Sequence, residues 1–208
     1  MKYLDKVKKE LNLNKKALRF IIGISFIGFI FGCLFILIIS KTDKTLVKDY
    51  IDSFIKNLNN NKINCLDLFK NTSFSNILFI LIIWILGMSV IGIPINLFYY
   101  FLKNFVLGFT CVSFMLTYKL KGCIFSLVYI IPHNLINIAI YTILLYYSLQ
   151  FSLLLLISII KKRNINFKFI INKYLKIFIF SFIGIILTSL YESFILPNIM
   201  KSLLFLIK

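Results

Sequence analysis

Histidine, acidic side chains and proline are all scarce in this sequence. Its 208 residues include one His, 7 Asp and Glu together, and three Pro. Zinc hydrolases need clustered ligands, as in HExxH, where two histidines one helical turn apart share the metal. A single histidine cannot supply that cluster, and paired intramembrane aspartates and a Walker phosphate loop are absent too. We therefore expect no enzyme, with no catalytic residue, no cofactor and no metal site.

The four cysteines show no CxxC or Cys/His spacing. Cys33, Cys111 and Cys123 lie in or beside apolar stretches, where cysteine behaves as a small hydrophobic residue. Cys65 lies in a polar stretch. Neither a zinc site nor a disulfide framework is indicated. A serine nucleophile needs its base within reach, and Ser89 lacks the flanking glycine pattern of such enzymes.

Apolar residues, by contrast, make up 60% of the chain, and the mean hydropathy is +0.93. Soluble domains use roughly 45–50% apolar residues, so the solvent of this chain is lipid. The apolar run 20–39 is long enough to remain as an uncleaved transmembrane helix. The formal net charge of +17 comes mostly from lysines, which we expect to face anionic lipid rather than nucleic acid.

Hydropathy and turn residues predict an all-α polytopic transmembrane bundle of about five spans. Glycine and proline favour a break at residues 92–96, and a polar turn is expected at 118–122. The stretch 123–160 is either one long helix broken at Pro132 or two crossings, which would make six spans. The predicted spans are 20–39, 77–93, 96–118, 123–160 and 177–196, where Pro197 is expected to stop the last helix.

The distribution of basic residues predicts the orientation of this single membrane domain, residues 1–208. Cytoplasmic flanks are enriched in Lys and Arg, and residues 1–19 carry seven of them. The loop 161–176 carries six more, and five spans place it on the same side. Five spans therefore satisfy the rule better than six. The loop 41–76 is then extracytoplasmic.

Within the loop 41–76, apolar residues recur at the i, i+3, i+4 spacing of an amphipathic helix. They are Leu46, Val47, Tyr50, Ile51, Phe54, Ile55 and Leu58. Such a helix lies on the outer membrane surface or caps the bundle. It serves either as a docking surface for a partner, through Tyr50, Phe54 and Leu58, or only as a cover for its own bundle.

Three ionisable residues fall inside apolar spans: Lys103, His133 and Glu192. Ionisable residues are costly in a membrane and suggest functional sites. Counting 1.5 Å per residue places Lys103 in the inner half of its span and Glu192 near the outer end of the last, so we do not expect them to be partners. Lys103 is expected to extend its ammonium toward the cytoplasmic interface. Glu192 is a candidate contact to another helix or a partner.

Pro132 interrupts the most apolar part of the chain. A proline frees a carbonyl on the preceding turn, which neighbouring side chains must satisfy. His133, Asn134 and Asn137 are well placed to do so, and we expect this helix-break cluster to be structural. Gly28 and Gly32 are four residues apart, a spacing that lets another helix approach closely. That helix belongs either to this chain, the commoner case, or to a partner.

The pattern of these features resembles the stage II sporulation protein M family. The resemblance rests on Asn76 opening an apolar helix, the Gly92-Ile93-Pro94 reversal, the Asn104–Gly108 segment and the Pro132-His133-Asn134 element. Wider relatives carry P-H-G-x-x-E, whereas this chain has Asn134 and Asn137 at the glycine and glutamate positions. That departure points to the sporulation branch and removes the acid that a catalytic site would need.

The resemblance implies a multi-pass membrane protein of the sporulation septum and of the mother-cell membrane during engulfment. Its partners would be the stage II sporulation proteins D and P, which degrade peptidoglycan, and its role would be a non-enzymatic scaffold that recruits or holds them. A homo-oligomer is left open. The alternative is a transporter or permease-like subunit, because broken helices with polar residues near mid-membrane can form substrate sites.

Overall fold

The computed structural model describes residues 15–60, 64–161 and 167–200, and these ranges are almost entirely helical, without a strand. The all-α prediction is confirmed. The helices are α2 (Lys15–Ile38), α3 (Lys41–Asn59), α4 (Cys65–Gly87), α5 (Gly92–Phe125), α6 (Ile131–Lys161) and α7 (Phe167–Leu190), with the π-helical segments η1 (Ser126–Ile130) and η2 (Tyr191–Ile195). The flanks 1–14 and 162–166, to which part of the predicted basic segments belongs, lie outside the described residues.

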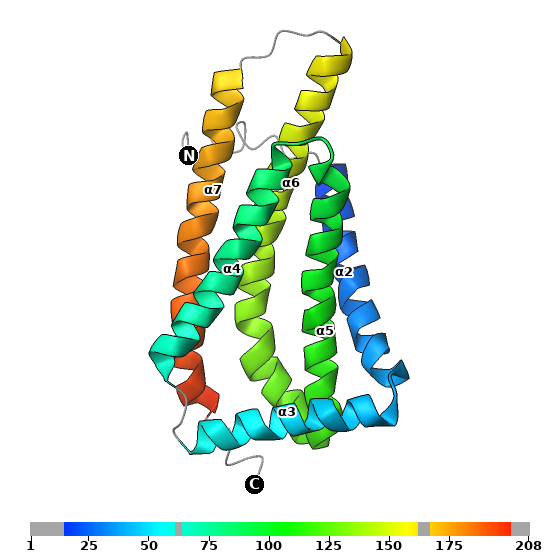
Figure 1. Cartoon of the computed structure of the whole chain (residues 1–208), viewed down its shortest axis with the longest axis vertical. Coiled ribbons are helices and arrows are strands. Elements are labelled where there is room, and N and C mark those ends of the chain that lie inside the picture. The colour runs from blue at the N-terminus through cyan, green and yellow to red at the C-terminus, as the bar shows by residue number, and fades with distance from the viewer. Residues whose placement is uncertain (1–14, 61–63, 162–166, 201–208) are drawn as a thin grey trace.

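Four helical stretches are long and apolar enough to cross a membrane: Lys15–Ile38, Cys65–Gly87, Gly92–Ile160 and Lys168–Met200. The third turns back on itself at Lys119, whose φ of 53° and ψ of −127° interrupt the helix. Beyond this turn Phe125 stacks on Phe114, with ring centroids 5.1 Å apart. Over the described residues the protein is therefore a multi-pass bundle of five long helices, α2, α4, α5, α6 and α7, arranged side by side (Figure 1).

The stretch predicted as 123–160 is one long helical path rather than two crossings. It passes through η1 directly into α6, which is continuous to Lys161. The beginnings of α2 and α7 and the end of α6 lie at one end of the bundle, and α3 lies at the other (Figure 1). This arrangement matches the five-span alternative.

Several predicted boundaries were wrong. Helix α4 begins at Cys65, not at 77, so the loop predicted for 41–76 is much shorter. The reversal predicted at 92–96 ends at Ile91, and Pro94 lies in the first turn of α5, where no intrahelical N–H is required. Helix α7 begins at Phe167, inside the predicted loop 161–176. The helical path continues past Pro197 to Met200.

Helix α2 packs closely on α5 through glycines. A Cβ at Gly28 would lie 2.7 Å from the backbone oxygen of Phe101, and one at Gly32 would lie 2.8 Å from the backbone nitrogen of Phe109. Gly108 of α5 faces the backbone of Phe29 in the same way. The prediction of Gly28 and Gly32 as partner-docking residues is corrected, because the chain's own α5 occupies this close approach.

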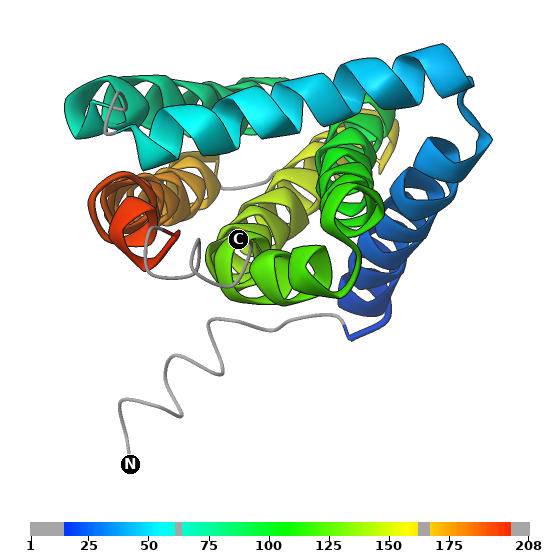
Figure 2. The same cartoon turned by 90° about the horizontal axis from the view of Figure 1, so that it is seen from below.

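Helix α3 lies across the end of the bundle (Figures 1 and 2). Its side chains Ile51, Ile55 and Leu58 are buried in one cluster with Phe114 of α5 and Ile130 of η1. The amphipathic helix expected from the spacing of residues 46–58 is present. Leu58 is only 1% exposed, so the prediction of Leu58 as a docking residue is corrected: it holds α3 to its own bundle.

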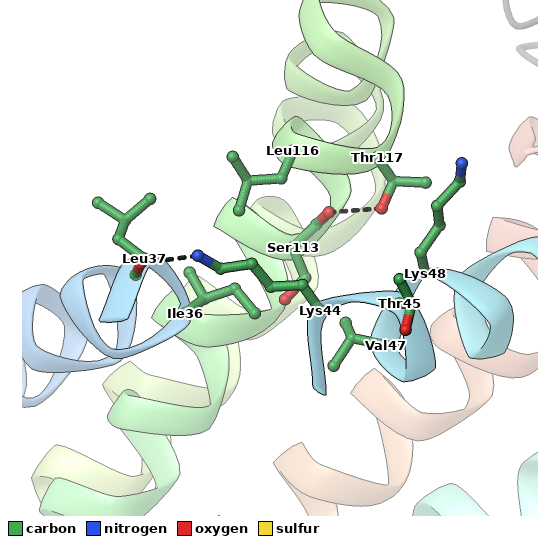
Figure 3. A pocket seen from close by; sticks show the side chains of 9 residues that line it. All are labelled: Ile36, Leu37, Lys44, Thr45, Val47, Lys48, Ser113, Leu116 and Thr117. Atoms are coloured by element: carbon green, nitrogen blue, oxygen red, sulfur yellow. Dashed lines mark hydrogen bonds between the residues drawn. The ribbon is translucent and has the colours of Figure 1, made fainter. Parts of the chain in front are cut away.

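The corner between α2 and α3 fixes this crosswise direction (Figure 3). Ser40 caps α3 by accepting a hydrogen bond from the backbone N–H of Asp43 at 3.1 Å, which satisfies one of the free donors of the first turn. Lys44 Nζ donates to the backbone oxygen of Leu37 at 2.7 Å. A cavity of about 270 Å³ lies at this corner, lined in part by Ser113 and Thr117 of α5. The rest of its lining comes from Ile36, Leu37, Lys44, Thr45, Val47, Lys48 and Leu116, so apolar and polar side chains both border it.

Candidate functional site

A second cavity, of about 320 Å³, lies among α4, α5, α6 and η2 and is lined entirely by polar and charged side chains. We call it the polar cavity. Its residues are Asn71, Thr72, Ser75, Asn76, Lys103, His133, Asn134, Asn137 and Glu192. All three ionisable residues singled out in the apolar stretches therefore line one space.

Lys103 is held in the interior by α4 and α6. Its Nζ donates to Asn76 Oδ1 at 3.2 Å and lies 5.4 Å from the ring centroid of Phe79 and 5.9 Å from that of Tyr141. Aromatic faces attract cations. Lys103 was predicted to extend toward the cytoplasmic interface, away from Glu192. That prediction was wrong, because the ammonium is engaged inside the bundle and both residues line the polar cavity.

The segment η1 precedes Pro132. Side chains that follow the proline form hydrogen bonds with backbone carbonyl oxygens of η1. His133 Nδ1 lies 2.7 Å from the backbone oxygen of Tyr129, and Asn134 Nδ2 donates to the backbone oxygen of Ile130 at 2.8 Å. Both contacts span one turn, across the site where the proline lacks an N–H. Asn137 has a different partner: its Oδ1 accepts a hydrogen bond from Thr188 Oγ1 of α7 at 2.6 Å. The structural role proposed for these residues stays a prediction.

The hydrogen bonds of His133 define its tautomer. A carbonyl oxygen only accepts, so Nδ1 donates to Tyr129. The amide nitrogen of Asn134 only donates, and it lies 3.0 Å from His133 Nε2, so Nε2 accepts. This arrangement is the neutral imidazole with its proton on Nδ1. It leaves no ring N–H for the Glu192 carboxylate, whose Oε1 lies 3.8 Å from Nε2.

Glu192 belongs to η2, where the backbone widens shortly before Pro197. Its side chain is 23% exposed, and within the described ranges it makes no hydrogen bond. Asn198 Nδ2, one residue after this proline, donates to the backbone oxygen of Phe194 at 3.2 Å. Asn134 makes the same i to i−4 bond after Pro132. The helical path through η1 and α6 and the one through α7 and η2 therefore each contain a π-helical segment and a proline, and an asparagine follows each proline.

The hydropathy pattern missed the α4 side of the polar cavity. Asn71, Thr72, Ser75 and Asn76 line it from this helix, and their polarity gives the segment the hydropathy of a loop. Their signal was the spacing: 71 and 75, like 72 and 76, are four residues apart and share one helical face. Asn76 Oδ1 also accepts a hydrogen bond from Tyr141 OH of α6 at 2.9 Å, so this amide joins three helices.

The chemistry open to this arrangement is binding. The polar cavity offers one cation, one carboxyl group and several amides and hydroxyls, but its imidazole is engaged at both nitrogens. Among residues 15–60, 64–161 and 167–200, no three His, Cys, Asp or Glu side chains gather as a metal site would require.

Comparison with protein families matches residues 20–197 to "Stage II sporulation protein M". Comparisons with curated proteins and with solved structures found no match. The matched range includes α3 to α7, all of α2 except its first five residues, and every residue of the polar cavity. This multi-pass membrane protein therefore belongs to the stage II sporulation protein M family.

Proposed function

We propose that this protein is a non-enzymatic scaffold that holds peptidoglycan-degrading proteins at the sporulation septum and in the engulfing mother-cell membrane. Its proposed partners are the stage II sporulation proteins D and P. Membership of the family supports a role in sporulation at a membrane. The excess of lysine and arginine in 1–19 and 161–176 supports a cytoplasmic position for that end of the bundle, which would put α3 on the outer side, where peptidoglycan lies.

The observation that carries this proposal is the solvent-facing side of α3. Its opposite side is held by the bundle cluster, and the hydroxyl of Tyr118 donates to Asp52 Oδ1 at 2.6 Å. These contacts fix the helix on the end of the bundle. Leu46 is 57% exposed and Tyr50 is 77% exposed, and both lie one turn apart on the free face. A rigid helix that presents an apolar pair to the outside suits the docking of a partner.

The double variant Leu46→Ala/Tyr50→Ala is expected to reduce co-purification of the two hydrolase partners at least tenfold, because interface aromatics carry much of the binding energy. The measurement is recovery of each partner with the tagged, gently solubilised protein from sporulating cells. Both residues are exposed, so the thermal stability of the bundle should not change.

The matched control is Lys48→Ala/Asp49→Ala, which alters the same exposed turn without changing its net charge. It should recover the partners as well as the wild type does. Undiminished recovery with Leu46→Ala/Tyr50→Ala would remove this face of α3 from the proposed function. Purification of the wild type without any partner would count against the scaffold itself.

The polar cavity supports a second candidate, a transporter or permease-like subunit. Lys103, His133 and Glu192 line it within the bundle, and His133 and Glu192 lie at helix breaks, a feature of transporter substrate sites. Alternating access would also need the polar cavity to open in turn to each side of the membrane. The residues that line this cavity come from α4, α5, α6 and η2, and none comes from α2. The scaffold therefore remains our first proposal.

Proteoliposomes containing the purified protein are expected to show no more flux of amino acids or phosphate than empty vesicles. The measurement is uptake of the labelled solutes, with His133→Ala in parallel. Flux in the wild type that disappears in His133→Ala would reverse the order of the two candidates.

A further inference from the structure

We propose that the polar cavity binds a dipolar phosphate–ammonium group, such as phosphoethanolamine, with the phosphate at Lys103 and the ammonium at Glu192. The group comes either from a phosphatidylethanolamine headgroup or from the free compound. This inference concerns the interior of the bundle and stands apart from the docking face of α3.

The Lys103 ammonium retains N–H donors that a ligand can use. A lysine ammonium has three N–H donors, and the structure engages one of them, at Asn76 Oδ1. The rings of Phe79 and Tyr141 attract the charge but are poor substitutes for an anion. An ammonium in an apolar bundle is costly unless it is paired, so an anionic oxygen in the polar cavity would stabilise it.

Among the residues that the structure describes, none donates a hydrogen bond to Glu192. Its Oε1 lies 3.8 Å from His133 Nε2, beyond hydrogen-bond distance, and that nitrogen already accepts from Asn134. The neutral tautomer offers the carboxylate neither a proton nor a positive charge. The carboxylate oxygens of Glu192 are therefore free to accept N–H bonds from a ligand.

Two charges of opposite sign therefore face the polar cavity. Lys103 and Glu192 come from different helices, line the same cavity and form no ion pair with each other in the part of the chain that the structure describes. A simple anion would be repelled by Glu192, and a simple cation by Lys103. A ligand with one group of each sign complements both. The side-chain amides and hydroxyls around them provide further donors for phosphate oxygens.

The size and opening of the polar cavity allow such a ligand. Its volume of about 320 Å³ far exceeds the ~10–15 Å³ that one water needs. Asn71 and Ser75 are exposed at the outer side of the α4 wall, so their polar side chains border an entrance. Nearby on α4, Phe74 is 66% exposed and Leu78 is 40% exposed, an apolar surface suited to acyl chains.

The test measures lipid retention by the purified full-length protein. In native mass spectrometry from mixed micelles, the wild type is expected to retain phosphatidylethanolamine at least tenfold better than phosphatidylglycerol, which lacks the ammonium. It should also prefer phosphatidylethanolamine to phosphatidylcholine, whose trimethylated nitrogen cannot donate to Glu192. Free phosphoethanolamine that displaces the lipid completely would identify the soluble compound as the source. If only added phosphatidylethanolamine displaces the bound lipid, the lipid headgroup is the source.

Lys103→Gln and Glu192→Gln should each lower retention of phosphatidylethanolamine about tenfold or more, the loss typical of a buried charge contact. The charge-matched controls are Lys48→Gln and Asp49→Asn on exposed α3, which should retain it as the wild type does. If either cavity variant fails to fold, Ser75→Trp keeps both charges and narrows the entrance from an exposed position, and it should also reduce retention. Equal retention of the three lipids by the wild type, or unchanged preference in the cavity variants, would overturn the proposal.

Discussion

Gly32→Leu is expected to lower the free energy of unfolding of the bundle by about 3 kcal/mol or more. A side chain at this position meets the backbone of α5 at Phe105 and Phe109. Backbone atoms of a packed helix cannot turn aside as a flexible side chain can. The two helices would have to separate along the contact that Gly28 and Gly108 also form.

Thermal unfolding followed by circular dichroism in detergent checks this prediction. For a chain of this size, 1 kcal/mol corresponds to roughly 2–4 °C, so the expected fall in Tm is roughly 6–12 °C. The matched control is Gly23→Leu in the same helix, where an added Cβ meets nothing within 4 Å. Its Tm should stay within about 2 °C of the wild type. Equal Tm values for the two variants would contradict the close packing of α2 on α5.

Asn76→Leu is expected to lower the free energy of unfolding by about 2–3 kcal/mol. The change removes the one oxygen that accepts hydrogen bonds from both the charged Lys103 and the neutral Tyr141. Asn76 is 5% exposed, and its Oδ1 accepts from Lys103 Nζ and from Tyr141 OH. Leucine has a similar size, so the loss would come from the unpaired ammonium and hydroxyl rather than from a cavity. Unfolding of delipidated protein in detergent measures the loss, with exposed Asn57→Leu on α3 as the control.

A double-variant cycle separates this explanation from a simple packing defect. Removing both partners of a buried polar contact costs less than removing one. Lys103→Met should therefore lower the free energy of unfolding less in the Asn76→Leu variant than in the wild type. The two losses should differ by about 1 kcal/mol, which is the coupling energy of the pair. Equal costs in both backgrounds would show that Asn76 acts only through its shape.

Much of the fold follows from local sequence signals. Apolar runs long enough to span lipid, the glycine and proline at the beginning of α5 and the polar turn at Lys119 together predicted the order of the five long helices. The spacing of residues 46–58 predicted α3, because amphipathic periodicity is a local property of the chain. Prediction failed at the beginning of α4, since Asn71 and Asn76 face a cavity and lower the hydropathy of a helical segment.

The candidate site was only partly predictable. Its ionisable residues were visible as charges in apolar stretches, yet their depths were counted along straight helices with the last one ending at Pro197. The structure extends that helix to Met200 and inserts η2 at Glu192, so Glu192 lies farther from the end of the helical path than the count suggested. The role of Tyr50 as a docking residue stays a prediction.

The sequence by itself determined that this chain lies in lipid, that it is helical, that it crosses about five times and that it carries one amphipathic helix. These properties follow from how each segment partitions between water and lipid. Only the tertiary structure decided that Gly32 belongs to a contact within the chain, that Leu58 is buried, and that Lys103, His133 and Glu192 share one cavity. Rotation and tilt of the helices set those contacts, because they depend on packing against neighbours distant in sequence.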